Sequence, residues 1–183
     1  MRPRSLRGVW AYGLLAMALG SLSPAVWAGT APFVVGIGDV APEAAGIVLQ
    51  GPAGIKLSQL KGRVVLLDFW ATWCGPCYES MPELNAMRNA LHREGYAQDF
   101  EVLSVATDTE VAKVRSFLRQ VPVDFPVVAD QIGIAPQTYK LWRLPAAYLI
   151  DRNGRVQMIY AGYGRGYTVE LKSSVIDLIK SGK

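Results

Sequence analysis

The two cysteines of the 183-residue sequence, Cys74 and Cys77, stand three positions apart in the segment Cys-Gly-Pro-Cys. A pair at this spacing can form and break a disulfide by thiol–disulfide exchange. The pair lies where a continuous apolar run, 64–69, gives way to a segment typical of a helix, 75–94. Because a helix N-terminus stabilises negative charge, we expect a lowered pKa for Cys74 and assign it as the attacking thiolate. Cys77, one turn further into the helix, is then the resolving thiol.

Four other roles for the pair fit less well. A structural zinc site needs about four ligands, and the lone His92 does not complete one. Covalent haem attachment needs Cys-x-x-Cys-His, whereas Tyr78 follows here. A purely structural disulfide gains little from closing so short a loop. Two buried free thiols remain the alternative. However, Gly75 would let a partner approach closely and Pro76 suits a first helical turn, so the pattern favours a redox-active pair.

Asp68 interrupts the apolar run that precedes the cysteines. A carboxylate in a buried strand costs free energy unless it is paired or protonated. Burial also raises the pKa of a carboxyl group towards the range of a general base. Asp68 is therefore a candidate proton carrier for the thiols, and a hydrogen-bonded structural aspartate at a strand end is the alternative.

The elements that would position these residues alternate between strands and helices. Apolar runs predict strands at 64–69, 100–106, 125–128, 146–150 and 155–161, and helical periodicity predicts helices at 75–94, 136–141 and about 168–179. Asp108 or Thr109 can cap a further helix that ends at Gln120. Asn153-Gly154 predicts a tight hairpin turn, residues 57–62 another turn, and residues 31–54 an extended arm or hairpin. This order is typical of an α/β fold with a mixed sheet.

Residues 1–28 have the three parts of a secretory signal: three arginines, an apolar stretch at 8–22, and Val26-Trp27-Ala28, which suits cleavage. An uncleaved membrane anchor at residues 8–28 is the alternative, because no charged residue occurs from Gly8 to Gly38. Loss of the three arginines lowers the formal net charge from +4 to +1 and leaves no basic stripe, so nucleic acid is not expected as a partner. In both cases residues 29–183 are expected outside the cytoplasm, in a periplasm or equivalent compartment.

The segment Phe69-Trp70-Ala71-Thr72-Trp73-Cys74-Gly75-Pro76-Cys77 resembles the active site of the thioredoxin superfamily, and specifically that of the exported TlpA/ResA-like thiol-disulfide oxidoreductases. The likeness extends over residues 38–179 and includes the segments 38–42, 57–65, 108–128 and 144–151. It implies a thioredoxin fold in one domain, 29–183. That fold has a mixed central sheet flanked by helices, an N-terminal β extension and a helix–strand insertion.

The resemblance also implies roles for residues outside the Cys-x-x-Cys segment. Pro145 would be the cis-proline beside the disulfide, rather than an ordinary trans turn proline. The backbone of Leu144 would pair with an extended substrate segment. Asp68 stands six residues before the first cysteine, where thioredoxin has its buried carboxylate, and would exchange a proton with Cys77.

Two departures from the family pattern affect this proton transfer. The glutamate that ResA-like proteins commonly place three residues after the second cysteine is replaced by Ser80, and the adjacent Glu79 would point about 100° away on a helix. The lysine that thioredoxin places near its carboxylate aligns with Ser104. Asp68 is therefore expected to transfer the proton without a second carboxyl group, and with little positive charge nearby to stabilise its ionised form.

For the aromatic and basic residues near the motif, the sequence predicts only a location. Trp70 is expected in the core, and Trp73 at the rim of the site in contact with substrate. Trp142 and Arg143 come just before Leu144-Pro145 and are expected near the same rim. His92 is expected on a helix surface.

The leading functional hypothesis is an exported reductase of protein disulfides that needs no cofactor beyond the Cys74–Cys77 pair. The resemblance implies a membrane-embedded electron donor and a pathway in cytochrome c or metal-centre maturation. A disulfide-donating oxidase or isomerase is the first alternative, because the compartment is oxidising. A metal chaperone or binding module is the second, although no His or Met pattern completes a copper site. A peroxidase in which Cys77 resolves a sulfenic acid is the weakest.

Overall fold

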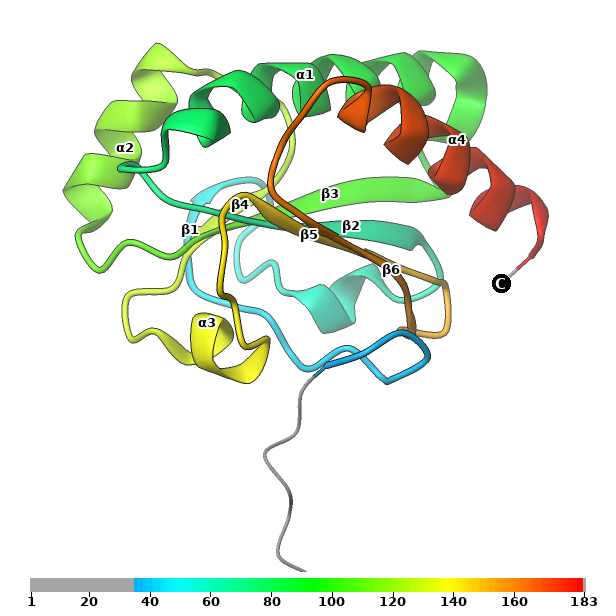
Figure 1. The fold of residues 1–183 in the computed structure, drawn as a ribbon, viewed down its shortest axis with the longest axis horizontal. Helices are drawn as coiled ribbons and strands as arrows, with labels where there is room; N and C mark the ends of the chain where they lie inside the picture. The colour runs from blue at the N-terminus through cyan, green and yellow to red at the C-terminus, as the bar shows by residue number, and fades with distance from the viewer. Residues whose placement is uncertain (1–34, 183) are drawn as a thin grey trace, which may run out of the picture. The chain divides into compact units, whose positions relative to one another are not determined.

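A six-stranded sheet forms the centre of the protein in the computed structural model, which describes residues 35–182 (Figure 1). Its strands are β1 (Ile47–Gln50), β2 (Val64–Trp70), β3 (Phe100–Ala106), β4 (Val127–Ala129), β5 (Ala146–Ile150) and β6 (Val156–Ala161). The order across the sheet is β1-β4-β3-β2-β5-β6, in which β2, β3 and β4 are parallel and the others antiparallel to their neighbours. The predicted mixed sheet and α/β class are confirmed. The predicted signal or anchor lies outside the described residues.

Helices cover both faces of the sheet (Figure 1). They are α1 (Gly75–Leu91), α2 (Val111–Gln120), α3 (Ile134–Thr138) and α4 (Tyr167–Lys180), with a short 3₁₀ helix at Leu57–Leu60. In Figure 1, α1, α2 and α4 lie on one face, and α3 and the 3₁₀ helix lie on the other. None of the helices within residues 35–182 is long and apolar enough to cross a bilayer.

Alternation along β2 divides the core into two layers. Leu66 and Trp70 pack in the cluster that contains Cys77 and the buried face of α1. Leu67 and Phe69 pack in a second cluster on the opposite face. Because successive side chains of a strand point to opposite faces, Asp68 shares the face of Leu66 and Trp70, which is the face covered by α1. The buried strand thereby places one carboxyl group under the helix that carries the cysteines.

Local predictions near the ends of elements needed correction. The strand predicted at 125–128 begins at Val127, because Pro126 has no N–H for the ladder and the Phe125 carbonyl accepts from the Gln50 side chain at 3.0 Å. The helix predicted at 136–141 is α3, which starts two residues before Pro136, where the Asp130 carboxylate accepts from the Ala135 N–H at 2.7 Å.

The prediction that Asp108 or Thr109 caps α2 is wrong. Glu110 is the N-cap residue and makes no side-chain cap hydrogen bond. The Asp108 carboxylate instead binds the loop that carries Cys74, as described below. His92 is half-buried rather than on the surface, with its ring Nε2 2.9 Å from the Phe100 carbonyl oxygen.

The residues before β2 do form extended structure. β1 pairs with β4 at one edge of the sheet, and Val40 forms a bridge with Arg155 at the start of β6. The segment from Val40 to β1 thus runs from the β6 edge of the sheet to the opposite edge. This segment is the N-terminal β extension that the family resemblance implied.

Candidate active site

Cys74 and Cys77 form a disulfide at the junction of β2 and α1, with their Cα atoms 5.3 Å apart. Cys74 is the N-cap residue of α1 and has extended backbone angles, while Pro76 occupies the first turn. Cys77 is fully buried, whereas Cys74 retains 4% exposure. Cys74 is thus the less buried member of the pair, which is the asymmetry expected between an attacking and a resolving thiol.

The residues on both sides of Cys74 in the sequence are exposed. Gly75 and Pro76 are exposed, and a Cβ added at Gly75 would meet no other atom within 4 Å. Trp73 is 74% exposed, so it stands at the rim as predicted, and Trp70 is fully buried against Phe117, with ring centroids 4.5 Å apart. The surface around Cys74 is thus open to a partner.

Asp68 is the buried carboxyl group on the α1 face of β2, with 1% exposure. The Ser104 hydroxyl, directly opposite on β3, donates to Asp68 Oδ2 at 3.1 Å. Asp68 Oδ1 has no hydrogen-bond partner among the described residues. Burial raises the pKa of Asp68 from 3.8 to about 7, and the hydrogen bond from Ser104 lowers it only in part. At neutral pH this group can therefore both accept and donate a proton.

At positions 79, 80 and 104 the sequence departs from the family pattern, and the structure shows what these three side chains do instead. Ser80 is buried, and its hydroxyl donates to the Cys77 carbonyl oxygen at 3.4 Å, so it does not supply a second carboxyl group. Glu79 is exposed on the outer side of α1. Ser104 offers Asp68 a neutral hydroxyl where thioredoxin would offer a cation. Burial raises the pKa of Asp68, and no salt bridge with a basic residue among residues 35–182 offsets that effect.

Asp108 is a structural residue of the site that sequence reasoning assigned elsewhere. Its carboxylate accepts from the Thr72 N–H at 2.9 Å and from the Thr72 hydroxyl at 2.5 Å. The Thr107 N–H, one residue earlier, donates to the Trp70 carbonyl at 2.9 Å. The loop that carries Cys74 is thereby tied to the end of β3. No local pattern could reveal this, because Thr72 and Asp108 meet only through the parallel register of β2 and β3.

The peptide bond between Leu144 and Pro145 is cis, as the resemblance implied. The Pro145 carbonyl accepts from the Gly162 N–H at 2.7 Å. Neither the N–H nor the carbonyl of Leu144 has a hydrogen-bond partner among residues 35–182. These two groups are free to pair with an extended segment of another protein.

The cis-proline loop and the Cys74 loop share a hollow of about 280 Å³. Its lining consists of Trp73, Thr107, Pro136, Leu141, Trp142, Arg143 and Leu144. Trp142 and Arg143 therefore line the same hollow as Trp73, as expected for residues at the rim. The structure brings together the predicted rim residues from two distant parts of the sequence.

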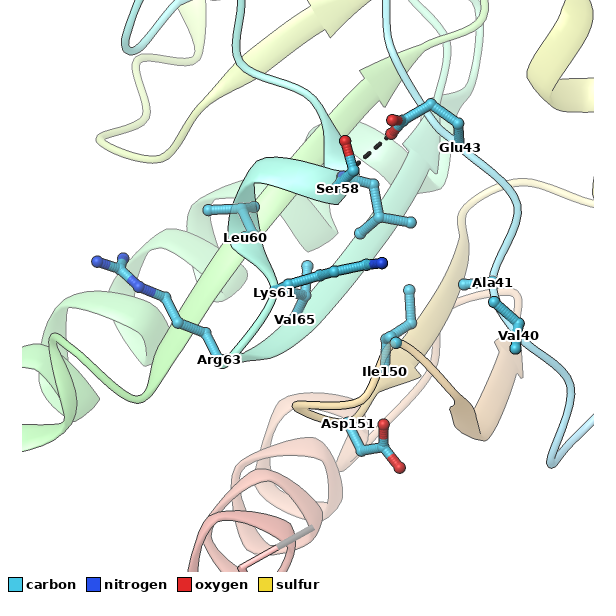
Figure 2. Close-up of a pocket in the computed structure, with 12 residues that line it drawn as sticks. Val40, Ala41, Glu43, Ser58, Leu60, Lys61, Arg63, Val65, Ile150 and Asp151 are labelled. Carbon is cyan, nitrogen blue, oxygen red and sulfur yellow. Dashed lines mark hydrogen bonds between the residues drawn. The ribbon is translucent and has the colours of Figure 1, made fainter.

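A second hollow lies at the other end of the sheet, and neither cysteine lines it (Figure 2). Val65 and Ile150 line it and are paired across β2 and β5, whereas the pair at the cysteine end of these strands is Phe69 and Ala146. In Figure 2 the Lys61 side chain extends across this hollow, and Glu43 accepts from the Ser58 N–H at 3.1 Å.

Comparison with known proteins agrees with this geometry. The family model for the AhpC/TSA family matches residues 37–159. A thiol-disulfide oxidoreductase ResA of Geobacillus thermodenitrificans is 30% identical over 151 residues, covering 81% of this chain and 84% of that protein. A ResA of Bacillus thuringiensis subsp. konkukian is 35% identical over 120 residues, which span 66%, just under two thirds, of each chain.

A solved structure is also similar. It is described as thiol:disulfide interchange protein DsbE of Chlorobium tepidum, and it superposes with a TM-score of 0.72 at 35% identity, covering 79% of this chain and 99% of that one. The chain therefore belongs to the AhpC/TSA family and groups with the ResA-like thiol-disulfide oxidoreductases of the thioredoxin superfamily.

Proposed function

We propose that this protein reduces disulfides of partner proteins outside the cytoplasm, using Cys74 and Cys77 as its dithiol. The observation that carries the proposal is the arrangement of the pair. Cys74 stands at a helix N-terminus and is 4% exposed, Cys77 is fully buried, and a carboxyl group with a pKa of about 7 lies beneath the same helix. The names of the relatives support the reaction class.

The first step is attack by the Cys74 thiolate on one sulfur of the partner's disulfide. A bond forms between Cys74 Sγ and that sulfur, the partner's disulfide bond breaks, and the second partner sulfur leaves as a thiolate that takes a proton from water. The helix N-terminus stabilises the Cys74 thiolate before the attack. The free backbone groups of Leu144 would hold the partner segment in line beside Cys74.

The second step releases the reduced partner. Asp68 accepts the proton of the Cys77 thiol, and the Cys77 thiolate attacks Cys74 Sγ. The mixed disulfide breaks, the partner sulfur leaves with its electron pair and is protonated, and the protein is left with the Cys74–Cys77 disulfide. The partner gains two electrons and two protons, which the dithiol loses. Asp68 suits this task because a base with a pKa near the working pH transfers protons efficiently.

A dithiol donor must then reduce the disulfide again. We propose that this donor is membrane-embedded and that no cofactor is needed beyond the cysteine pair. Proteins whose cysteines must be reduced before haem or a metal centre is attached are the proposed targets. The extracytoplasmic location follows from the predicted signal or anchor at residues 1–28, which also allows a membrane-tethered form.

The reduction potential of the pair tests the direction of the reaction. The full chain is equilibrated in thiol/disulfide buffers, and its thiol state is read by alkylation and mass spectrometry. A value of about −250 mV or lower is expected for a reductase. A value of about −120 mV, typical of a strong oxidant, would instead make the protein a disulfide donor.

A further inference from the structure

The hollow between the Cys74 loop and the cis-proline loop has an unusual lining. Two tryptophans, Trp73 and Trp142, contribute to it from segments nearly 70 residues apart, and their side chains are 74% and 79% exposed. Large exposed aromatic side chains that gather at one place are typical of protein-binding surfaces, where Trp is enriched among the residues that dominate affinity. The apolar lining favours a partner side chain that is itself apolar.

Arg143 is the charged residue in that lining. It forms no salt bridge with an acidic residue among residues 35–182. An exposed guanidinium without a carboxylate beside an apolar hollow is complementary to a negative group on a partner. Arginine is also suited to hold a carboxylate through two parallel hydrogen bonds.

The absence of a Cβ at Gly162 leaves room for the Arg143 side chain beside the cis-proline loop. A Cβ at position 162 would lie 3.0 Å from Arg143 Nε and 3.1 Å from its Cζ. Gly162 has a φ of +91° and its N–H donates to the Pro145 carbonyl at 2.7 Å. The guanidinium thus lies beside Gly162 at the end of β6, and Arg143 directly precedes Leu144, the residue whose backbone would pair with a substrate segment.

We propose that this hollow selects the target. It binds an extended segment of a partner protein in which the reactive cysteine is flanked by an acidic residue, held by Arg143, and by an aromatic or large aliphatic residue, held between Trp73 and Trp142. The inference rests on the proposed function, because it assigns the substrate class of the same site. The backbone of Leu144 aligns the segment, and the side-chain contacts supply the preference.

Three disulfide-bonded peptides of one backbone test this preference. The residue next to the reactive cysteine is Asp in the first, Asn in the second and Lys in the third, and a Phe follows in each. The value of kcat/KM is measured with the reduced full chain at low ionic strength. We expect the Asp peptide to be reduced roughly fivefold faster than the Asn peptide, and the Lys peptide more slowly than both, as for a single partly exposed ion pair.

Variants of Arg143 separate selection from structure. Arg143→Gln should abolish the difference between the peptides, Arg143→Lys should retain most of it, and Arg143→Glu should reverse it. Arg93→Gln is the matched control, because Arg93 is exposed beyond the far end of α1 and should change nothing. Trp142→Ala should raise KM for all three peptides with little change in kcat.

Two results overturn the proposal. The first is equal kcat/KM for the three peptides with the wild-type chain. The second is an equal loss for all peptides in Arg143→Gln, which would assign a structural role to Arg143. A small aromatic disulfide that lacks a peptide chain is reduced in parallel. If the wild type reduces this compound but does not discriminate among the peptides, only the selection fails. If it reduces neither, the proposed function fails as well.

Discussion

Replacement of Asp68 by asparagine is expected to make the oxidised protein more stable above neutral pH. The carboxyl group is buried, has one oxygen without a partner among the described residues, and has a pKa raised from 3.8 to about 7. Between these two values the folded state keeps the proton that the unfolded state has lost. Stability therefore falls as the pH rises from about 4 to about 7, because the unfolded state then binds fewer protons.

The size of the effect follows from that difference. A pKa displaced from 3.8 to about 7 corresponds to about 4 kcal/mol of destabilisation once both states are ionised. Between pH 5 and pH 8 the loss amounts to roughly 2–3 kcal/mol. Asparagine is neutral throughout and can keep the hydrogen bond with Ser104, so the variant should lose this pH dependence and gain stability at pH 8.

Urea unfolding of the oxidised wild type and the Asp68→Asn variant, at pH 5 and pH 8, measures the effect. The control is Asp177→Asn, because Asp177 is exposed on α4 and its removal should leave the pH dependence of the wild type unchanged. A variant that is less stable than the wild type by the same amount at both pH values would refute the reasoning. Such a result would mean that Asp68 does not titrate between pH 5 and pH 8 in the folded protein.

Three further predictions concern the reaction and the fold. Asp68→Asn should slow release of the reduced partner near pH 7 by about a hundredfold. Acid quenching and mass spectrometry of the mixed disulfide measure this rate. An unchanged pH–rate profile would leave Asp68 with a structural role only. Cys77→Ser should accumulate a mixed disulfide through Cys74, visible on a non-reducing gel, whereas a Cys74→Ser chain that still forms such adducts would contradict the assigned roles. Arg88→Met should cost about 3–5 kcal/mol in urea unfolding, because it leaves the buried Glu101 carboxylate without its partner at 2.8 Å, and the double variant Arg88→Met/Glu101→Leu should recover most of the loss.

Much of the fold could be predicted because its signals are local. β2 and β3 are mostly apolar and buried along their whole length, so their observed bounds differ from the predicted ones by one residue at most. The turn at Asn153-Gly154 needs a positive φ, which Gly154 supplies at +81°. The candidate catalytic residues could be predicted for the same reason, because Asp68, Cys74 and Cys77 lie within ten residues on one strand, loop and helix.

Contacts between distant segments could not be predicted in this way. Asp108 stands where a helix cap is expected, and only the register of β3 against β2 shows that it binds Thr72 instead. The pairing of β1 with β4 likewise depends on which sheet edge is left open. The cis bond before Pro145 came from family resemblance, since a single sequence does not distinguish a cis from a trans proline.

The attachment of the N-terminal segment determines how the domain would carry a mechanical load. The Gly38 N–H donates to the Val156 carbonyl at 2.7 Å, the Val156 N–H to the Asp39 carbonyl at 2.9 Å, and the Ala41 N–H to the Gly154 carbonyl at 2.8 Å. A pull on the chain before residue 38 therefore loads the β5–β6 hairpin at its turn. That turn lies at the end of the sheet away from Cys74, because Val156 is opposite Ile150 while Ala161 is opposite Ala146. In a membrane-tethered form, a load would therefore enter the sheet at the end opposite Cys74.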